Sequence, residues 1–176
     1  MKRRLLLILT GLVSAVLISG CGFGRISYAG KHLVFETTDT EGNPVSSEEL
    51  FAQHEITMLN LWATWCGPCV TELPYLNLVN EELAKMDGAV VGLINDGNGK
   101  ADLETAKHHL EESSAAYLNI LAPANFRDLI TQTAYPTTVF VNRDGIVIGE
   151  TLIGTTVPRA IVDYYVSAAR EALESK

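Results

Sequence analysis

Two cysteines separated by two residues, Cys66 and Cys69, are the side chains of this chain best suited to carry chemistry. They follow a run of apolar and β-prone residues, 56–62, which predicts a buried strand. We expect a helix to begin at the cysteines, so that the sulfurs lie one turn apart and within reach of a disulfide. Cys66 then stands at the positive end of the helix dipole, which favours a thiolate. The pattern predicts an exposed, ionisable thiol and a second thiol that displaces whatever the first one binds.

Other uses of a Cys-x-x-Cys pair are half of a zinc site, a structural disulfide or a haem attachment site. A zinc site takes about four ligands, and the sequence has no second pair of this kind and no spaced pair of histidines. His108 and His109 are adjacent, so they point to different faces of a helix. Haem attachment needs histidine at position 70, where the chain has Val70. We therefore expect a redox-active dithiol, with no metal and no other cofactor.

The N-terminus predicts export. Lys2, Arg3 and Arg4 precede an apolar run over 5–18 that is short for a membrane span of about 20 residues. The sequence Ile18-Ser19-Gly20-Cys21 resembles the bacterial lipobox, which implies cleavage before Cys21 and attachment of a diacylglycerol to it. The alternative is a plain signal peptide or signal anchor that leaves Cys21 as a free thiol. We expect a signal peptide over 1–20, a lipidated tether over 21–32 and one folded domain over 33–176.

The net charge of the chain bears on whether its partner could be a nucleic acid. Without residues 1–20 the chain has 10 Lys and Arg against 21 Asp and Glu, a net charge of about −11. Such a surface argues against nucleic acid as a partner. Export also places the cysteines in a compartment where disulfides persist.

Short apolar runs alternate with helical patterns after residue 33, which predicts an α/β domain. The cysteine helix is expected to end near Asp87, with a kink at Pro74. Ser46 or Ser47 is expected to cap a single helical turn over 48–51. The other expected strands start at 33 and cover 89–94, 117–121, 136–141 and 146–149, and the other helices cover 101–113, 126–131 and the end of the chain from 158.

Two motifs carry a family resemblance. Trp65-Cys66-Gly67-Pro68-Cys69 matches the thioredoxin active site, and Tyr135-Pro136-Thr137 matches the loop that holds the cis-proline of that family. With an extra helix and strand at about 101–121, the chain resembles the membrane-tethered, thioredoxin-like proteins of the TlpA/ResA type. The resemblance implies a thioredoxin fold: a mixed central sheet flanked by helices, with an N-terminal strand extension and a helix–strand insertion. It also implies that the substrate contacts Trp65, Gly67, Pro68, Tyr135 and Pro136, and that the Tyr135 backbone pairs with an extended substrate segment.

The chain departs from thioredoxin itself at two positions. Asn60 stands where thioredoxins have a buried aspartate, and Val70 stands where they usually have lysine. Glu72 and Pro74 fit a Cys-x-x-Glu-x-Pro arrangement that membrane-tethered relatives share. We expect Glu72 to exchange a proton with Cys69 in place of the missing carboxylate. The alternative is a solvated acid that the helix dipole favours in the first turn.

The resemblance implies a thiol–disulfide oxidoreductase anchored to the outer face of the bacterial cytoplasmic membrane. The Gly-Pro pair between the cysteines resembles reducing thioredoxins, near about −270 mV, rather than oxidants near about −120 mV. A reductant outside the cytoplasm must be regenerated, which implies a membrane electron donor of the CcdA/DsbD type. Expected protein substrates are apocytochrome c or an extracytoplasmic methionine sulfoxide reductase.

Three other functions are alternatives to a disulfide reductase. A disulfide-introducing oxidase would show a potential above about −150 mV. A copper or haem chaperone would use the two cysteines as soft ligands, and a tight Cu(I) site would reveal it. An anchored adhesion protein with an inherited fold would not reduce insulin. A peroxidase is disfavoured because Ala63 stands where the peroxiredoxin pattern has threonine.

Overall fold

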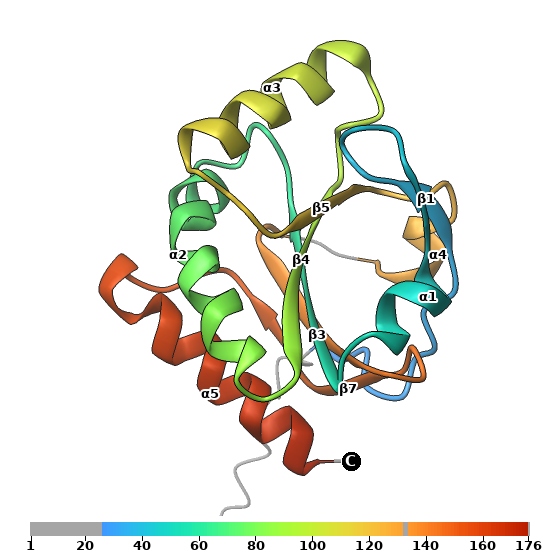
Figure 1. Ribbon diagram of the computed structural model, residues 1–176, viewed down its shortest axis with the longest axis vertical. Helices are drawn as coiled ribbons and strands as arrows, with labels where there is room; N and C mark the ends of the chain where they lie inside the picture. The colour runs from blue at the N-terminus through green and yellow to red at the C-terminus, as the bar shows by residue number, and fades with distance from the viewer. Residues whose placement is uncertain (1–25, 132–133, 176) are drawn as a thin grey trace, which may run out of the picture.

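A five-stranded mixed sheet forms the centre of the computed structural model, which describes residues 26–131 and 134–175 (Figure 1). The strand order is β5-β4-β3-β6-β7. β4 runs parallel to β3 and β5 runs parallel to β4, whereas β6 is antiparallel to β3 and β7 is antiparallel to β6. The mixed α/β sheet predicted from the sequence is confirmed. Its strands are β3 (Ile56–Trp62), β4 (Gly88–Ile94), β5 (Leu118–Leu121), β6 (Thr137–Asn142) and β7 (Val147–Ile153).

Helices cover both faces of the sheet, which is why β3 and β4 read as continuous apolar runs. In β3, Met58 and Trp62 join the core beneath α2 and α5, while Leu59 and Leu61 join the core beneath α1 and α4. The alternation along one strand therefore builds two cores. The helices are α1 (Ser47–Ala52), α2 (Gly67–Ala84), α3 (Lys100–Glu112), α4 (Phe126–Leu129) and α5 (Ile161–Glu174), with a 3-10 turn η1 (Pro158–Ala160) before α5.

The helix and strand predicted at about 101–121 are α3 and β5, and β5 extends the sheet beyond β4. Asn77 of α2 fixes the loop between them, because its Nδ2 donates to the Ser114 carbonyl at 2.8 Å and its Oδ1 accepts from the Ala116 N–H at 2.9 Å. Deeper in the sheet, the Trp62 indole donates to Asn119 Oδ1 at 3.2 Å. The insertion is thus bound to the strand and the helix that flank the cysteines.

Residues before 33 make backbone contacts with the domain. The signal peptide and Cys21 expected from the sequence lie outside the described residues, but the end of the expected tether lies against the start of β7. The Gly30 N–H donates to the Val147 carbonyl, and the Val147 N–H donates to the Lys31 carbonyl, both at 2.8 Å. The strand expected from residue 33 starts later, and β1 (Glu36–Thr38) pairs with β2 (Pro44–Ser46) as an antiparallel hairpin.

Several element ends differ from the prediction. α2 ends at Ala84 rather than near Asp87, because Asp87 takes a left-handed φ of 55° that turns the chain into β4. Ser46 occupies the N-cap position of α1 without a side-chain bond, while Ser47 Oγ accepts the Phe35 N–H at 2.9 Å instead. β7 continues to Ile153, four residues beyond the predicted end. Pro74 lies inside α2.

Candidate active site

Cys66 and Cys69 form a disulfide at the start of α2, directly after β3. Their Cα atoms lie 5.3 Å apart. Cys66 is the N-cap residue, and its Sγ accepts the Cys69 N–H at 3.3 Å. Gly67 and Pro68 form the first turn, where proline is tolerated because its missing N–H would have no helical partner. The predicted pairing and the predicted helix start are confirmed.

The disulfide is more enclosed than the sequence suggested. Cys66 is 5% exposed and Cys69 is fully buried. The prediction of an exposed thiol is therefore wrong for the oxidised form. The reason is a tight turn before α2, in which the Cys66 N–H donates to the Ala63 carbonyl at 3.0 Å and the side chain joins the core beneath α2 and α5. Cys66 is still the more exposed residue of the two.

Two loops meet beside the disulfide. The register of β3 with β6 pairs Leu61 with Thr137, so the cysteine loop and the Tyr135–Pro136 loop lie at the same end of the sheet. The Tyr135–Pro136 peptide bond is cis. Trp65 is 69% exposed, and its ring meets the Tyr135 ring edge-on with centroids 5.4 Å apart. The structure thus brings together the two motifs that carry the family resemblance.

The segment before Cys66 is anchored by Asp96, a residue that the sequence analysis did not single out. The carboxylate accepts the Thr64 N–H at 3.1 Å and the Thr64 hydroxyl at 2.6 Å. In addition, the Asn95 N–H donates to the Trp62 carbonyl at 2.9 Å. The end of β4 therefore holds the turn that presents Trp65 and the first cysteine.

Glu72 lies one turn after Cys69 and is fully buried, so the alternative of a solvated acid is wrong. Its Oε1 accepts Asn60 Nδ2 at 2.9 Å, and its Oε2 accepts the Tyr165 hydroxyl at 2.9 Å. Asn60 Nδ2 also donates to Thr138 Oγ1 at 3.1 Å. Burial raises the pKa of the Glu72 carboxyl, and the hydrogen bonds from Asn60 and Tyr165 oppose that rise. A carboxyl in this setting can hold or release a proton next to the second cysteine.

Tyr165 is the member of this cluster that sequence reasoning missed, because it was assigned to the apolar stripe of the last helix. The available signal was its hydroxyl, since a buried tyrosine in such a stripe usually bonds a polar partner. Burial and the Glu72 charge both raise the pKa of Tyr165, so it remains a neutral donor.

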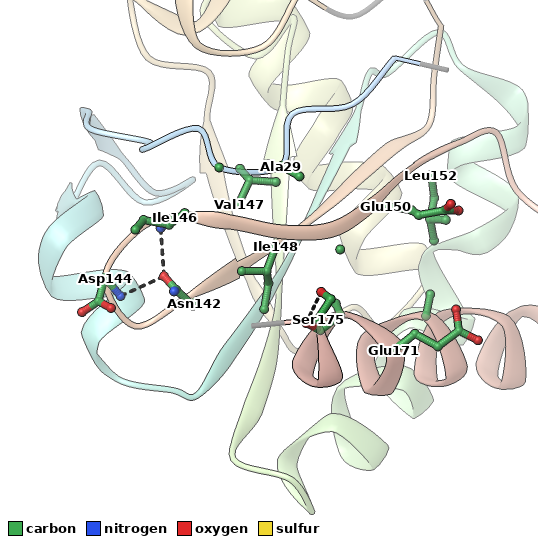
Figure 2. Close-up of a pocket in the computed structure, with 14 residues that line it drawn as sticks. Ala29, Asn142, Asp144, Ile146, Val147, Ile148, Glu150, Leu152, Glu171 and Ser175 are labelled. Carbon is green, nitrogen blue, oxygen red and sulfur yellow. Dashed lines mark hydrogen bonds between the residues drawn. The ribbon is translucent and has the colours of Figure 1, made fainter. Parts of the chain in front are cut away.

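Other parts of the described chain offer no second centre of this kind. Within residues 26–131 and 134–175, no group of three His, Cys, Asp or Glu side chains is placed to hold a metal ion. No helix in the same ranges has the length and apolar character needed to cross a bilayer. A cavity of about 800 Å³ lies between β7 and the end of α5, with Ile148, Glu171 and Ser175 among its lining residues (Figure 2). None of the predicted site residues lines it.

Relatives share most of the chain. The family model for Redoxin matches residues 28–163. The chain is similar to the thiol-disulfide oxidoreductase ResA of Bacillus subtilis (strain 168), with 28% identity over 175 residues that cover 93% of each protein. It is also similar to the thiol:disulfide interchange protein DsbE of Haemophilus influenzae, with 43% identity over 56 residues that cover 32% of this chain and 29% of that protein.

Solved structures show the same thioredoxin-like fold. A thiol:disulfide interchange protein of the thioredoxin family from Chlorobium tepidum TLS superposes with a TM-score of 0.65 at 21% identity, over 85% of this chain and 99% of that one. A secreted disulfide oxidoreductase of Mycobacterium tuberculosis gives a TM-score of 0.59 at 20% identity, over 77% and 94% of the two chains. With a disulfide between Cys66 and Cys69 at the start of α2, the chain belongs to the Redoxin family and is a thiol–disulfide oxidoreductase of the ResA/DsbE type.

Proposed function

We propose that the protein reduces disulfides of exported polypeptides through Cys66 and Cys69. The Cys66 thiolate attacks one sulfur of the substrate disulfide, and the other substrate sulfur leaves as a thiolate. Cys69 then attacks the Cys66 sulfur of this mixed disulfide, which releases the second substrate thiolate and leaves the Cys66–Cys69 disulfide. Two electrons pass to the substrate. The observation that carries this proposal is a disulfide at a helix N-terminus, whose more exposed residue, Cys66, directly follows Trp65 at its ring contact with Tyr135.

The surface around the disulfide suits an extended polypeptide. Trp65 and Tyr135 present aromatic rings, and Gly67 has no atom within 4 Å of the position that a Cβ would take. Pro68 follows in the first turn of α2, and Pro136 follows Tyr135 in the opposite loop. In this proposal the backbone at Tyr135 pairs with the substrate, which places the substrate disulfide against Cys66.

Glu72 is the proton partner of Cys69 in this mechanism. Both side chains are fully buried, and they stand three residues apart on α2, where neighbouring side chains face each other. When Cys69 attacks, its proton moves to the Glu72 carboxylate, which Asn60 and Tyr165 hold in place. The raised pKa of Glu72 supports this role, because a carboxyl of ordinary pKa would bind a thiol proton poorly at neutral pH.

The cellular setting follows from the N-terminal sequence. We propose that residues 1–20 are removed, that a lipid on Cys21 anchors the domain outside the cytoplasmic membrane, and that a membrane dithiol donor of the CcdA/DsbD type re-reduces Cys66 and Cys69. Apocytochrome c or an exported methionine sulfoxide reductase is the protein substrate. The lipobox-like sequence before Cys21 and the Gly-Pro pair of the active site support this setting.

Trapping tests the function directly. Cys69→Ser should leave mixed disulfides on Cys66, and mass spectrometry of the trapped species identifies the substrates. The mature protein should reduce insulin and Cys66→Ser should not. The redox potential of its Cys66–Cys69 pair should be about −270 mV. A potential above about −150 mV would instead assign the protein to the oxidases, and a wild type that leaves insulin intact would refute the enzyme mechanism.

A further inference from the structure

A second cavity adjoins the active site, and apart from Trp65 and Tyr135 its lining residues have no part in the mechanism above. It measures about 330 Å³, at the low end of the range for ligand pockets, about 300–1,000 Å³. Trp65 and Tyr135 form one side of it, and these residues immediately precede Cys66 and Pro136. The cavity is therefore continuous with the surface on which the substrate disulfide must lie.

The floor of this cavity is apolar. Phe126 and Ile130, from α4 and the residue after it, line it and are 5% and 1% exposed. Both belong to the core beneath α1 and α4, so the floor is fixed by packing and needs no rearrangement to form. A cavity of this size with aromatic walls and an apolar floor suits one large apolar side chain, since burying such a side chain is favourable.

The rim carries an exposed cation. Arg127 lines the cavity, and no ion pair joins its guanidinium to another residue within 26–131 or 134–175. The Asp96 carboxylate, whose charge also acts on Tyr135, accepts hydrogen bonds from the backbone and hydroxyl of Thr64 and does not line the cavity. Positive charge is scarce in a chain with 13 Lys and Arg against 21 Asp and Glu. A cation at this rim favours acidic neighbours around the bound side chain.

Strand geometry fixes which substrate residue reaches the cavity. In an extended segment, side chains two residues apart point to the same side, whereas adjacent ones point to opposite sides. A segment whose cysteine faces Cys66 therefore directs the residue two positions away toward the same protein surface, where the cavity opens beside Trp65 and Tyr135.

We propose that the cavity between Trp65, Tyr135 and α4 is a specificity subsite of the oxidoreductase. It selects polypeptides that carry a large apolar side chain two residues from the reactive cysteine, and an acidic rather than a basic side chain at the next position on the same face, four residues from that cysteine. This inference rests on the proposed reductase function, because it assumes that a substrate cysteine reaches Cys66.

Symmetric disulfide dimers of single-cysteine peptides test the subsite. The peptides carry Phe or Ala at both positions two residues from the cysteine, and Asp or Lys at both positions four residues from it, which share the same face of an extended segment. For the reduced full-length protein we expect kcat/KM to be about tenfold higher with Phe than with Ala, which corresponds to about 1.4 kcal/mol of binding. Asn95→Phe, which places a ring in the cavity from its rim, should bring this ratio close to one.

The charge preference has a matched control. Arg127→Glu should invert the ratio of kcat/KM between the Asp and Lys peptides, whereas the same change at exposed Arg170 on α5 should leave it at the wild-type value. Comparing ratios between variants cancels the effect of Asp or Lys on the intrinsic reactivity of the peptide. Equal rates for Phe and Ala peptides, or an Asp-to-Lys ratio that Arg127→Glu does not move, would overturn the subsite. Failure of the wild type to reduce any of the four dimers would instead overturn the reductase function.

Discussion

Tyr165→Phe isolates the contribution of one hydroxyl to the buried carboxyl of Glu72. The hydroxyl donates to Glu72 Oε2 at 2.9 Å, and the substitution removes that donor while keeping the ring in the core. A hydrogen bond to a charged group contributes about 1.5–3 kcal/mol and one to a neutral group about 0.5–1.5 kcal/mol. The ionised carboxyl therefore loses about 1–1.5 kcal/mol more than the protonated one. We expect the proton affinity of Glu72 to rise about five- to thirteenfold, because 1.36 kcal/mol corresponds to a factor of ten.

The assay is an NMR titration of labelled glutamate side chains in the oxidised protein, where the disulfide keeps both cysteines from titrating. Tyr164→Phe is the matched control, because Tyr164 neighbours Tyr165 with ring centroids 5.1 Å apart but does not share its hydrogen bond to Glu72. The Glu72 midpoint should move to higher pH in Tyr165→Phe only. In the reduced enzyme, the pH dependence of the resolving step should move in the same direction. Equal midpoints in the two variants would refute a positioning role for Tyr165.

Three further predictions concern the site and its support. The pKa of Glu72 is raised above its ordinary value of 4.5 in the folded chain. The wild type should therefore lose folding stability as the pH rises from about 4.5 through the folded pKa. Urea unfolding at a series of pH values should show that Glu72→Gln lacks this loss. Gly92→Ala should lower the free energy of unfolding by about 1–3 kcal/mol, because a Cβ at this position collides with the Asn119 amide. Gly67→Ala places its Cβ in open space and should change the free energy of unfolding little. Thermal melts that rank the two variants the other way would contradict this. Asp96→Ala removes the hydrogen bonds that anchor the turn before Cys66. This variant should show a lower kcat for insulin reduction, while Cys66 is still alkylated. An unchanged kcat would show that the turn keeps its conformation without Asp96.

The part of the site that the sequence predicted is local. The apolar run over 56–62 and the two cysteines define a strand, a turn and the start of a helix within fourteen residues of chain, from Ile56 to Cys69. Over so short a stretch, the spacing of apolar residues and the helix-start signals come from neighbouring residues and can be read from the sequence. Glu72 was found through the Cys-x-x-Glu-x-Pro arrangement of membrane-tethered relatives, a pattern that is also local because it lies on the same helix. Tyr165 lies 93 residues after Glu72. The spacing of apolar residues in α5 predicted that Tyr165 is buried, but it could not indicate which buried acid its hydroxyl would bond.

Errors at element ends have a similar cause. No strand was predicted at residues 44–46, yet Pro44 begins β2 opposite Thr38. Proline is tolerated there because the hairpin has only two strands, so a missing N–H interrupts no central ladder. The enclosure of Cys66 could not be predicted either, since it depends on how the turn at Ala63 sits under the helices on that face.

The N-terminal segments also govern how this sheet meets other polypeptides. At one edge, Asp39 bridges to Ile120 and Thr37 Oγ1 donates to the Leu121 carbonyl at 2.7 Å, which covers β5. At the other edge, the residues before β1 occupy the start of β7, and Gly149 at a φ of 68° interrupts the regular strand beyond them. Exposed rows of unpaired amides at a sheet edge invite self-association. Both edges are thus covered in part, so the substrate pairing that we propose at the Tyr135 loop and the protection from aggregation would come from the same architecture.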